Sequence, residues 1–461
     1  MAQLVPHLRD FCGRYTERFV TSTRSCARQA RLYLRGLVQA PRKKKNMERM
    51  VEKVANADYQ AMQQFITDSP WDASGVFDQV ALDANDRLPR HGNRRLAIDE
   101  SAFAKKGGDS AGVARQWNGR LGKVDNCQVG VFASFGADGQ DVLVNAKLYV
   151  PEEWAKDPAR CKKAKIPAAD QECVPKHVMA LHMVKHAREL GLEFDWVAAD
   201  GGYGRIPAFL RGLAEMGETF MVDVHSDQRV YLEPPRPHAP PAPHRGRPPS
   251  RLISDVQPVE VRALVASAPK DAWQTVRVRD TTKGWLETRF LRLQTWLWDG
   301  QEADVRELTL VIREDQNADG SPRLKYSLSN AVANTPLERL ALMQGERFWI
   351  EDTFHNGKGS LGMADYQTRK WRSWHHHMAL VAMALQFMME ERQTLSEMEP
   401  LVSCNDIVEF LEWMLPKQAA SLDDLVGQML KRHRQRQASI DLSHRDKNTL
   451  HATDKMVNIN A

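Results

Sequence analysis

Two aspartates each follow a short apolar run, a position at which their carboxylates could take part in catalysis or bind a metal ion. Asp99 closes the apolar run Leu96 to Ile98, and Asp200 closes the apolar run Trp196 to Ala199. Short apolar runs of this kind predict buried strands, and functional groups of open α/β sheets gather beyond the strand ends. Because any α/β protein has aspartates at strand ends, these two residues alone are weak evidence for a catalytic site.

Glu351 is a third acidic candidate, and two cations flank it. Arg347, Glu351 and Lys358 follow the spacing R-x(3)-E-x(6)-K. If this segment is helical, the three side chains share one face, since their offsets return close to the same direction. A structural ladder of salt bridges explains the spacing as well as a functional role does. In the functional interpretation, Glu351 completes a metal site while Arg347 and Lys358 bind DNA phosphates.

Three carboxylates on rigid supports favour metal-assisted chemistry on a phosphodiester. Two divalent ions about 3.5 to 4 Å apart can activate an oxygen nucleophile and stabilise the leaving oxygen. Mg²⁺ prefers hard oxygen ligands and keeps several waters, so a few carboxylates suffice. We therefore expect Asp99, Asp200 and Glu351 to be both the catalytic residues and the ligands of two Mg²⁺ or Mn²⁺ ions.

The elements around these residues predict an α/β fold. Apolar or alternating runs end near residues 99, 135 and 150, and they indicate three adjacent strands. A helix that includes residues 179–190 and a strand leading into Asp200 then follow. Three antiparallel strands, a crossover helix and further alternating elements describe a ribonuclease-H-like core.

The chain divides into five predicted regions. They are a basic helical domain over residues 1–90, the first part of the core over 91–225, an insertion over 226–335 with a proline-rich basic loop and then an all-β part, core helices carrying Glu351 over 336–395, and a helical C-terminal region over 396–461. The polar tail of the last region, after about residue 432, is expected to be disordered.

The N-terminal region is the predicted DNA-binding domain. Residues 1–60 hold 13 Lys or Arg against 5 Asp or Glu, and such an excess favours an anionic partner. Lys43 and Lys44 belong to a basic cluster at an expected break between helices, and they are the candidate DNA contacts. A solvated basic bundle is the alternative for any single helix of this region.

Composition limits the other classes of protein. Hydrophobic residues make up 42% and charged residues 27%, which is typical of a globular protein with a sizeable core. The six cysteines show no C-x-x-C pair, so reduced thiols are expected rather than a zinc site,. The sequence shows neither a signal peptide nor an apolar stretch long enough for a membrane helix, so a cytoplasmic protein is expected. No Lys-Ser/Thr follows the glycines after Asp200, so no nucleotide cofactor is expected.

The combined motifs resemble those of DDE transposases from bacterial insertion sequences. The resemblance spans roughly residues 65 to 390, and it includes the segments 114–128, 325–330 and 371–377 besides the three acidic motifs. One position departs from the family pattern, which often has Tyr three residues before the Arg, where this chain has Gln344.

The resemblance implies a reaction and its partners. The expected activity is cleavage at transposon ends, which frees a 3′ hydroxyl, followed by attack of that hydroxyl on target DNA. The implied partners are double-stranded DNA, with which the protein would associate at the nucleoid, and a second copy of the chain in the synaptic complex. A tryptophan of the insertion can stack on a flipped base in similar enzymes. Trp298 is taken as that contact, although Trp273, Trp285 and Trp296 are also candidates and a buried core position is the alternative for each.

Three other interpretations remain open from the sequence. A nuclease of the same fold would use the same carboxylates without joining strands. A non-catalytic DNA-binding relic would keep the fold, but the retained acidic and basic motif residues argue against it. A glycoside hydrolase also uses paired carboxylates, but it gives no reason for the basic N-terminus.

Overall fold

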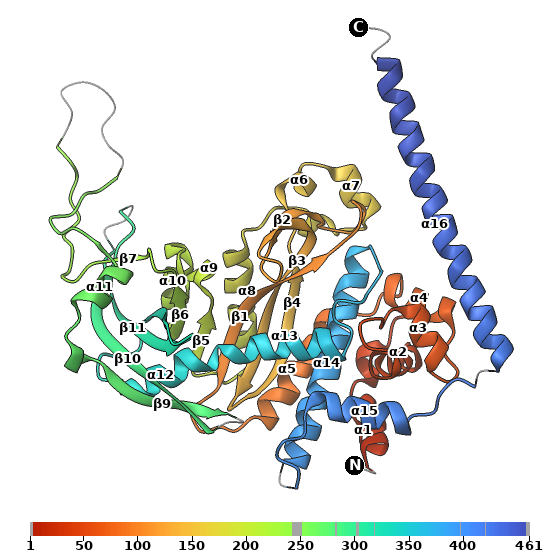
Figure 1. The fold of residues 1–461 in the computed structure, drawn as a ribbon, viewed down its shortest axis with the longest axis horizontal. Helices are drawn as coiled ribbons and strands as arrows, with labels where there is room; N and C mark the ends of the chain where they lie inside the picture. The colour runs from red at the N-terminus through yellow and green to blue at the C-terminus, as the bar shows by residue number, and fades with distance from the viewer. Residues whose placement is uncertain are drawn as a thin grey trace.

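A large mixed β-sheet with helices around it forms the body of the protein. The structure is a computed structural model, and it describes residues 3–241, 251–281, 284–300, 304–317, 319–396, 398–419 and 421–457. A helical bundle lies at the N-terminal end, and the long helix α16 (Leu422–Val457) projects from the body (Figure 1). The expectation of a mixed α/β fold is confirmed. No helix within the described ranges is long and apolar enough to span a membrane.

The sheet orders its strands so that the two halves of the chain meet in its centre. Within the described residues the order is β2-β3-β1-β5-β6-β12-β11-β10-β9, and β4 pairs with β3. The first group is β1 (Arg95–Ala104), β2 (Ala114–Asn118), β3 (Lys123–Ala137), β4 (Gln140–Leu148), β5 (Trp196–Ala199) and β6 (Phe220–Val224). The second group is β9 (Gln274–Thr281), β10 (Gly284–Leu297), β11 (Arg306–Gln316) and β12 (Pro322–Ser329).

The pairing of β1 with β5 brings two predicted site residues to one sheet edge. The two strands are parallel, and Ile98 lies opposite Ala199. Asp99 and Asp200 each follow these paired residues, so both lie at the same end of the β1 and β5 pairing. Helix α8 (Lys176–Glu189) precedes β5, as the helical spacing predicted.

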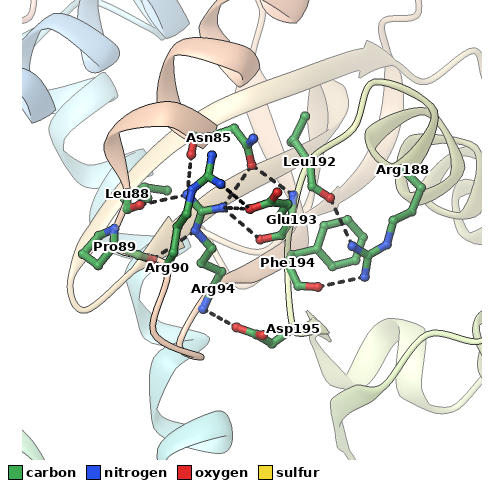
Figure 2. A network of polar contacts seen from close by, with 10 residues as sticks. All are labelled: Asn85, Leu88, Pro89, Arg90, Arg94, Arg188, Leu192, Glu193, Phe194 and Asp195. Carbon is green, nitrogen blue, oxygen red and sulfur yellow. Dashed lines mark hydrogen bonds and ion pairs between the residues drawn. The ribbon is translucent and has the colours of Figure 1, made fainter.

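A network of polar contacts fixes the opposite ends of β1 and β5 (Figure 2). The buried Arg94 guanidinium donates to the carbonyl of Leu88 at 2.8 Å and to the side chain of Asn85 at 3.1 Å. The Arg94 backbone N–H donates to the Asp195 carboxylate at 2.8 Å. Arg188 donates to the carbonyl of Phe194 at 2.8 Å. Because these bonds join the loop before β1 to the loop before β5, they fix the register that the acidic residues depend on.

The N-terminal helices pack against the core rather than standing apart from it. They are α1 (Leu4–Arg14), the 3₁₀ turn η1 (Thr16–Phe19), α2 (Ala27–Gln39), α3 (Met47–Lys53), α4 (Tyr59–Thr67) and α5 (Ala73–Arg87). Their main neighbour is the buried helix α14 (Trp371–Leu395). The His376 ring stacks on Trp71 with ring centroids 3.7 Å apart, and His377 Nδ1 lies 2.9 Å from the Tyr33 hydroxyl. These histidines therefore hold the N-terminal helices onto the core.

The segment predicted as an all-β insertion needs a correction. It contains the helix α11 (Val261–Ser267) and the 3₁₀ turn η3 (Lys270–Ala272), besides the small strand pair β7 (Arg229–Val230) and β8 (Val259–Glu260). Helix α11 has seven residues, or about two turns, and this length is too short to distinguish from a strand by periodicity,. Strands β9 to β12 extend the main sheet, because β12 pairs with β6. Residues 242–250 of the proline-rich loop lie outside the described residues.

The remaining helices lie between the strands or follow the sheet. They are α6 (Glu152–Ala155), α7 (Pro158–Lys163), η2 (Ala168–Asp170), α9 (Gly201–Gly204), α10 (Pro207–Glu215), α12 (Leu337–Glu346), α13 (Phe348–Ser360) and α15 (Cys404–Met414).

The expectation of a disordered polar tail was wrong for residues 433–457, and its last part, residues 458–461, lies outside the described residues. Helix α16 continues through the polar tail to Val457. The tail lacks Gly and Pro and is rich in helix-forming residues, so its polarity gave no reason against a helix.

A buried ion pair offers a test of how the sheet is held to α12. Arg95 is fully buried and contacts the carboxylates of Asp141 and Glu346, the latter at 2.5 Å. We predict that Arg95→Met lowers the free energy of unfolding by about 3 to 5 kcal/mol, because two carboxylates stay buried without their cation. Urea denaturation measures the change. The exposed pair Lys185 and Glu189 is the control, and Lys185→Ala should cost less than about 1 kcal/mol,. Equal effects of both substitutions would contradict the account.

Candidate active site

The Arg347 guanidinium joins acidic side chains from three parts of the chain. Its Nη2 donates to Glu351 Oε1 at 2.7 Å, and its Nε donates to Asp223 Oδ2 at 2.8 Å. Its Nη1 lies 3.5 Å from Asp99 Oδ2. The cation is itself only 14% exposed. Three carboxylates that are distant in sequence therefore converge on one buried cation.

The position of Arg347 explains this arrangement. It differs from the expectation that Arg347, Glu351 and Lys358 all lie within one helix. It lies at the junction between α12 and α13, and Phe348 begins the second helix. Glu351 and Lys358 lie on α13 itself. Arg347 and Glu351 still meet across one turn, as the four-residue spacing predicted. The same junction lets Arg347 reach β1 and β6, which a residue within a helix facing solvent could not do.

The pKa of the Asp99 carboxyl group is strongly raised. Burial raises the pKa of its carboxyl group to about 7, the neighbouring Asp200 carboxylate adds to the rise, and the Arg347 cation opposes it. Glu351 also contributes to the rise. Asp200 is thus close enough to repel Asp99, and Asp99 also lies near Arg347 and Glu351.

The side chain of Asp200 is fixed by the start of a short helix. Its Oδ1 accepts the backbone N–H of Gly202 at 3.0 Å and that of Tyr203 at 3.3 Å. Gly204, one turn later, faces the backbone of Asp223, and a Cβ at this position would lie 2.0 Å from the Asp223 carbonyl oxygen. The last glycine of the motif is therefore required because α9 packs directly on the end of β6.

Asp223 is a further acidic member of the site, which the sequence analysis did not select. It follows Val222 on β6, and its Oδ1 accepts a hydrogen bond of 2.6 Å from the Ser327 hydroxyl on β12. The buried Gln344 amide donates to the same Ser327 oxygen at 2.9 Å. Gln344, the position that departs from the family pattern, thus supports Asp223 through Ser327. Only the β6 and β12 pairing reveals this, and the sequence carries no signal for it.

Lys358 lies further along α13, near Asp99 and two aromatic rings. Its ammonium group is 5.5 Å from the centroid of the Phe103 ring and 5.7 Å from that of Phe354. Burial lowers the pKa of Lys358 to about 8, and Arg120 lowers it further while Asp99 raises it. The structure thus brings Lys358 to the side of the carboxylates.

The other predicted DNA contacts lie away from the carboxylates or are partly covered. Lys43 and Lys44 are exposed between α2 and α3. Their neighbour Lys45 is buried and donates to the Val38 carbonyl. Trp298 is half-buried, and its ring lies 6.1 Å from that of Tyr231. Trp285 is the more exposed of the insertion tryptophans whose burial is described, at 56%.

Glu100, next to Asp99, belongs to a separate group. It accepts a hydrogen bond of 2.5 Å from the Lys176 ammonium, and burial raises the pKa of its carboxyl group. Tyr203 also contacts Glu100, and burial together with the nearby acids raises the pKa of its hydroxyl. These contacts fix the Glu100 side chain beside the site without joining it to Arg347.

The acidic residues have the chemical type of ligand that a hard divalent cation prefers. Carboxylate oxygens are the ligands that Mg²⁺ prefers, and the repulsion between Asp99 and Asp200 is one that a cation would relieve. Within the described ranges, however, no three acidic, histidine or cysteine side chains are arranged so that they could hold an ion. Arg347 supplies the positive charge in the arrangement seen.

The raised pKa of Asp99 predicts how stability depends on pH without metal. The folded value of about 7 lies above the unfolded value of about 4,. Protonation therefore favours the folded state, and this contribution is lost as pH rises from about 4 through about 7. We predict that Asp99→Asn raises the free energy of unfolding by on the order of 2 to 4 kcal/mol at pH 8 in EDTA, with little change near pH 4. Urea denaturation at both pH values measures this, with the exposed Asp227→Asn as control. A constant difference across pH would contradict the prediction.

The chain is similar to known proteins over part of its length. A family model described as DDE superfamily endonuclease matches residues 17–285, which is more than half of the chain. A curated relative, the probable transposase for insertion sequence element IS701 of Microchaete diplosiphon, is 26% identical over 193 residues. This match covers 42% of the present chain and 47% of the relative, so it spans about half of each. The extent of the family match shows that the chain belongs to the DDE superfamily endonucleases.

Proposed function

We propose that this chain is a DNA transposase that cleaves phosphodiester bonds at transposon ends and transfers the freed strand into target DNA. The observation that carries the proposal is the convergence of Asp99, Asp223 and Glu351 on Arg347, with Asp200 beside Asp99. Family membership supports a nuclease reaction on DNA. The name of the insertion-sequence relative supports the assignment to transposition.

We assign the catalytic role to Asp99, Asp200 and Glu351. Endonucleases of this superfamily generally use divalent metal ions, and the three carboxylates are the proposed ligands for two Mg²⁺ or Mn²⁺ ions. Bound ions would supply Lewis-acid activation of the attacking oxygen and stabilisation of the leaving oxygen. Glu351 has the most exposed side chain of the carboxylates bonded to Arg347, at 52%, so it is the one best able to change its position when ions or DNA arrive.

The cations beside the carboxylates have two proposed roles. Arg347 orients Asp99 and Glu351, and the carboxylates take three of the five N–H donors of its guanidinium,. The remaining donors could meet a DNA phosphate, as the sequence suggested. Lys358 lies nearby with a pKa lowered mainly by burial. A phosphate that reached this ammonium group would favour its charged form and gain a charge-assisted hydrogen bond.

We also propose a ribonuclease-H-like core for the chain and a division into domains. The antiparallel β1, β3 and β4 followed by the parallel β5 and β6 support a ribonuclease-H-like core over residues 91–225 and 336–395. Residues 226–335 would then be an insertion into that core, and Trp298 remains a proposed DNA contact there. Residues 1–90, with the exposed Lys43 and Lys44, would bind double-stranded DNA. Two copies of the chain would be needed to pair two transposon ends.

A nuclease without strand transfer is the second candidate. It would use the same three carboxylates, so no contact within the site separates the two reactions. The match to the transposase relative is the observation that favours transposition. Only a reaction that follows both the cut end and its joining to a second DNA distinguishes them.

The direct test is incubation of the full chain with DNA that carries the ends of its own element, target DNA and Mg²⁺. We predict nicking at the ends and joined products, and Asp200→Ala should abolish both, with a loss of at least about a thousandfold in rate. Asp227→Ala, an exposed change outside the carboxylate group, is the matched control and should be active. End-specific nicking that survives Asp200→Ala would refute the catalytic assignment. Nicking without joining would favour the nuclease.

A further inference from the structure

The hairpin formed by β2 and β3 carries an exposed combination of aromatic and basic side chains. Trp117 on β2 is 62% exposed, and its cross-strand partner Val124 is 49% exposed. Arg115 on the same strand is also exposed, as are Arg120 and Lys123 at the turn. Leu121 at the turn is also 43% exposed, and exposed apolar side chains that are grouped together with a polar rim mark interaction sites. β2 is an edge strand of the sheet, so one of its sides is open.

The strand register puts Trp117 on the same face of the sheet as Asp99. Asp99 lies opposite Phe132 in the pairing of β1 with β3, and Val124 lies opposite Trp117 in the pairing of β3 with β2. Phe132 and Val124 both lie on β3, eight residues apart, and β3 pairs with β1 and with β2 without a register shift. Because every second residue of a strand faces the same way, Phe132 and Val124 share one face of the sheet. Arg115, two residues before Trp117, therefore faces that way as well. This is the face on which α13 lies, because Phe354 of α13 packs against Phe132.

The cations of the hairpin are not neutralised by neighbours. Arg115, Arg120 and Lys123 form no ion pair with any residue in the described part of the chain, whereas most other cations around the core do. Asp125 is the acidic residue that the hairpin itself contributes. The surface is therefore positively charged on balance and suits a polyanion.

Lys358 links the hairpin to the carboxylates. Arg120 is close enough to lower the pKa of Lys358, and Asp99 acts on the same lysine in the opposite direction. Arg347 and Lys358 lie eleven positions apart along one helical segment, which corresponds to about 16 Å. A row of cations thus leads from the carboxylates to the hairpin, in the order Arg347, Lys358 and Arg120. Such a row could contact successive phosphates of one nucleic acid strand.

We propose that the β2 and β3 hairpin is a DNA-binding element that grips the strand next to the scissile phosphate. Trp117 stacks on an unpaired base near the cut end, and Arg115, Arg120 and Lys123 contact the phosphates on either side. Aromatic stacking on bases together with cations along the backbone is how proteins hold single-stranded nucleic acid. The proposal rests on the proposed function for the identity of the partner, and it adds the surface that would hold the DNA end.

The test measures DNA binding by the full chain in EDTA, where metal-dependent cleavage cannot occur. The probes are a short fluorescent duplex with a few unpaired nucleotides at one end and a blunt duplex of the same sequence. We expect Trp117→Ala to weaken binding to the frayed duplex about tenfold and to the blunt duplex far less, because only the first offers a base for stacking. Trp117→Phe should restore most of the loss. Trp413→Ala, which removes a tryptophan 80% exposed on α15, is the matched control and should bind as the unsubstituted chain does.

The cations are tested through the salt dependence of the same binding. Arg120→Ala should reduce the slope of log affinity against log salt by about one, because one phosphate contact is lost. Trp117→Ala should leave that slope unchanged. Unaltered affinity for the frayed duplex in Trp117→Ala, or failure of Trp117→Phe to restore it, would overturn the proposal. These results do not depend on activity. If the unsubstituted chain fails to cut transposon ends with Mg²⁺, the proposed function fails while a positive binding result still stands.

Discussion

The contact of Arg347 with carboxylates from β1, β6 and α13 is the interaction on which the site depends. Acidic side chains brought together with little solvent repel one another, and burial already raises the pKa of Asp99 to about 7. A buried guanidinium offsets that repulsion and fixes the geometry through several hydrogen bonds at once. Asp223 accepts a hydrogen bond from the same guanidinium. Ser327 donates to Asp223, and Gln344 donates to Ser327, so both residues support Asp223. The acidic cluster can therefore persist in the folded chain without a metal ion.

The sheet topology makes this contact possible. The parallel pairing of β1 with β5 and of β5 with β6 brings Asp99, Asp200 and Asp223 to one edge. The pairing of β6 with β12 then returns the chain after a long excursion, so that α12 and α13 follow directly beside that edge. The network around Arg94 holds the opposite end of the strand pair. The carboxylates are thus positioned by backbone pairing, while the cation between them comes from a helix junction.

The sequence predicted local features well and contacts between distant segments poorly. Apolar runs ending in Asp99 and Asp200 identified β1 and β5, because each run is short, buried and clearly bounded. Helix α11 was missed because seven residues give too little periodicity, and the polar tail was misjudged because polarity alone does not oppose a helix. Asp223 could not be selected, since its role follows from pairing of β6 with a strand about a hundred residues later. Likewise, the exposed face of Trp117 follows from strand register, which no single stretch of sequence encodes.

Metal binding by the full chain tests whether Asp99, Asp200 and Glu351 serve one shared site. Mn²⁺ binding by the full chain can be followed by electron paramagnetic resonance, which counts free ions. We predict that Asp99→Asn, Asp200→Asn and Glu351→Gln each weaken the same binding by at least about tenfold, while Asp227→Asn leaves it unchanged. Tight Mn²⁺ binding that persists in any one of the three would contradict the claim, because that carboxylate would then act elsewhere.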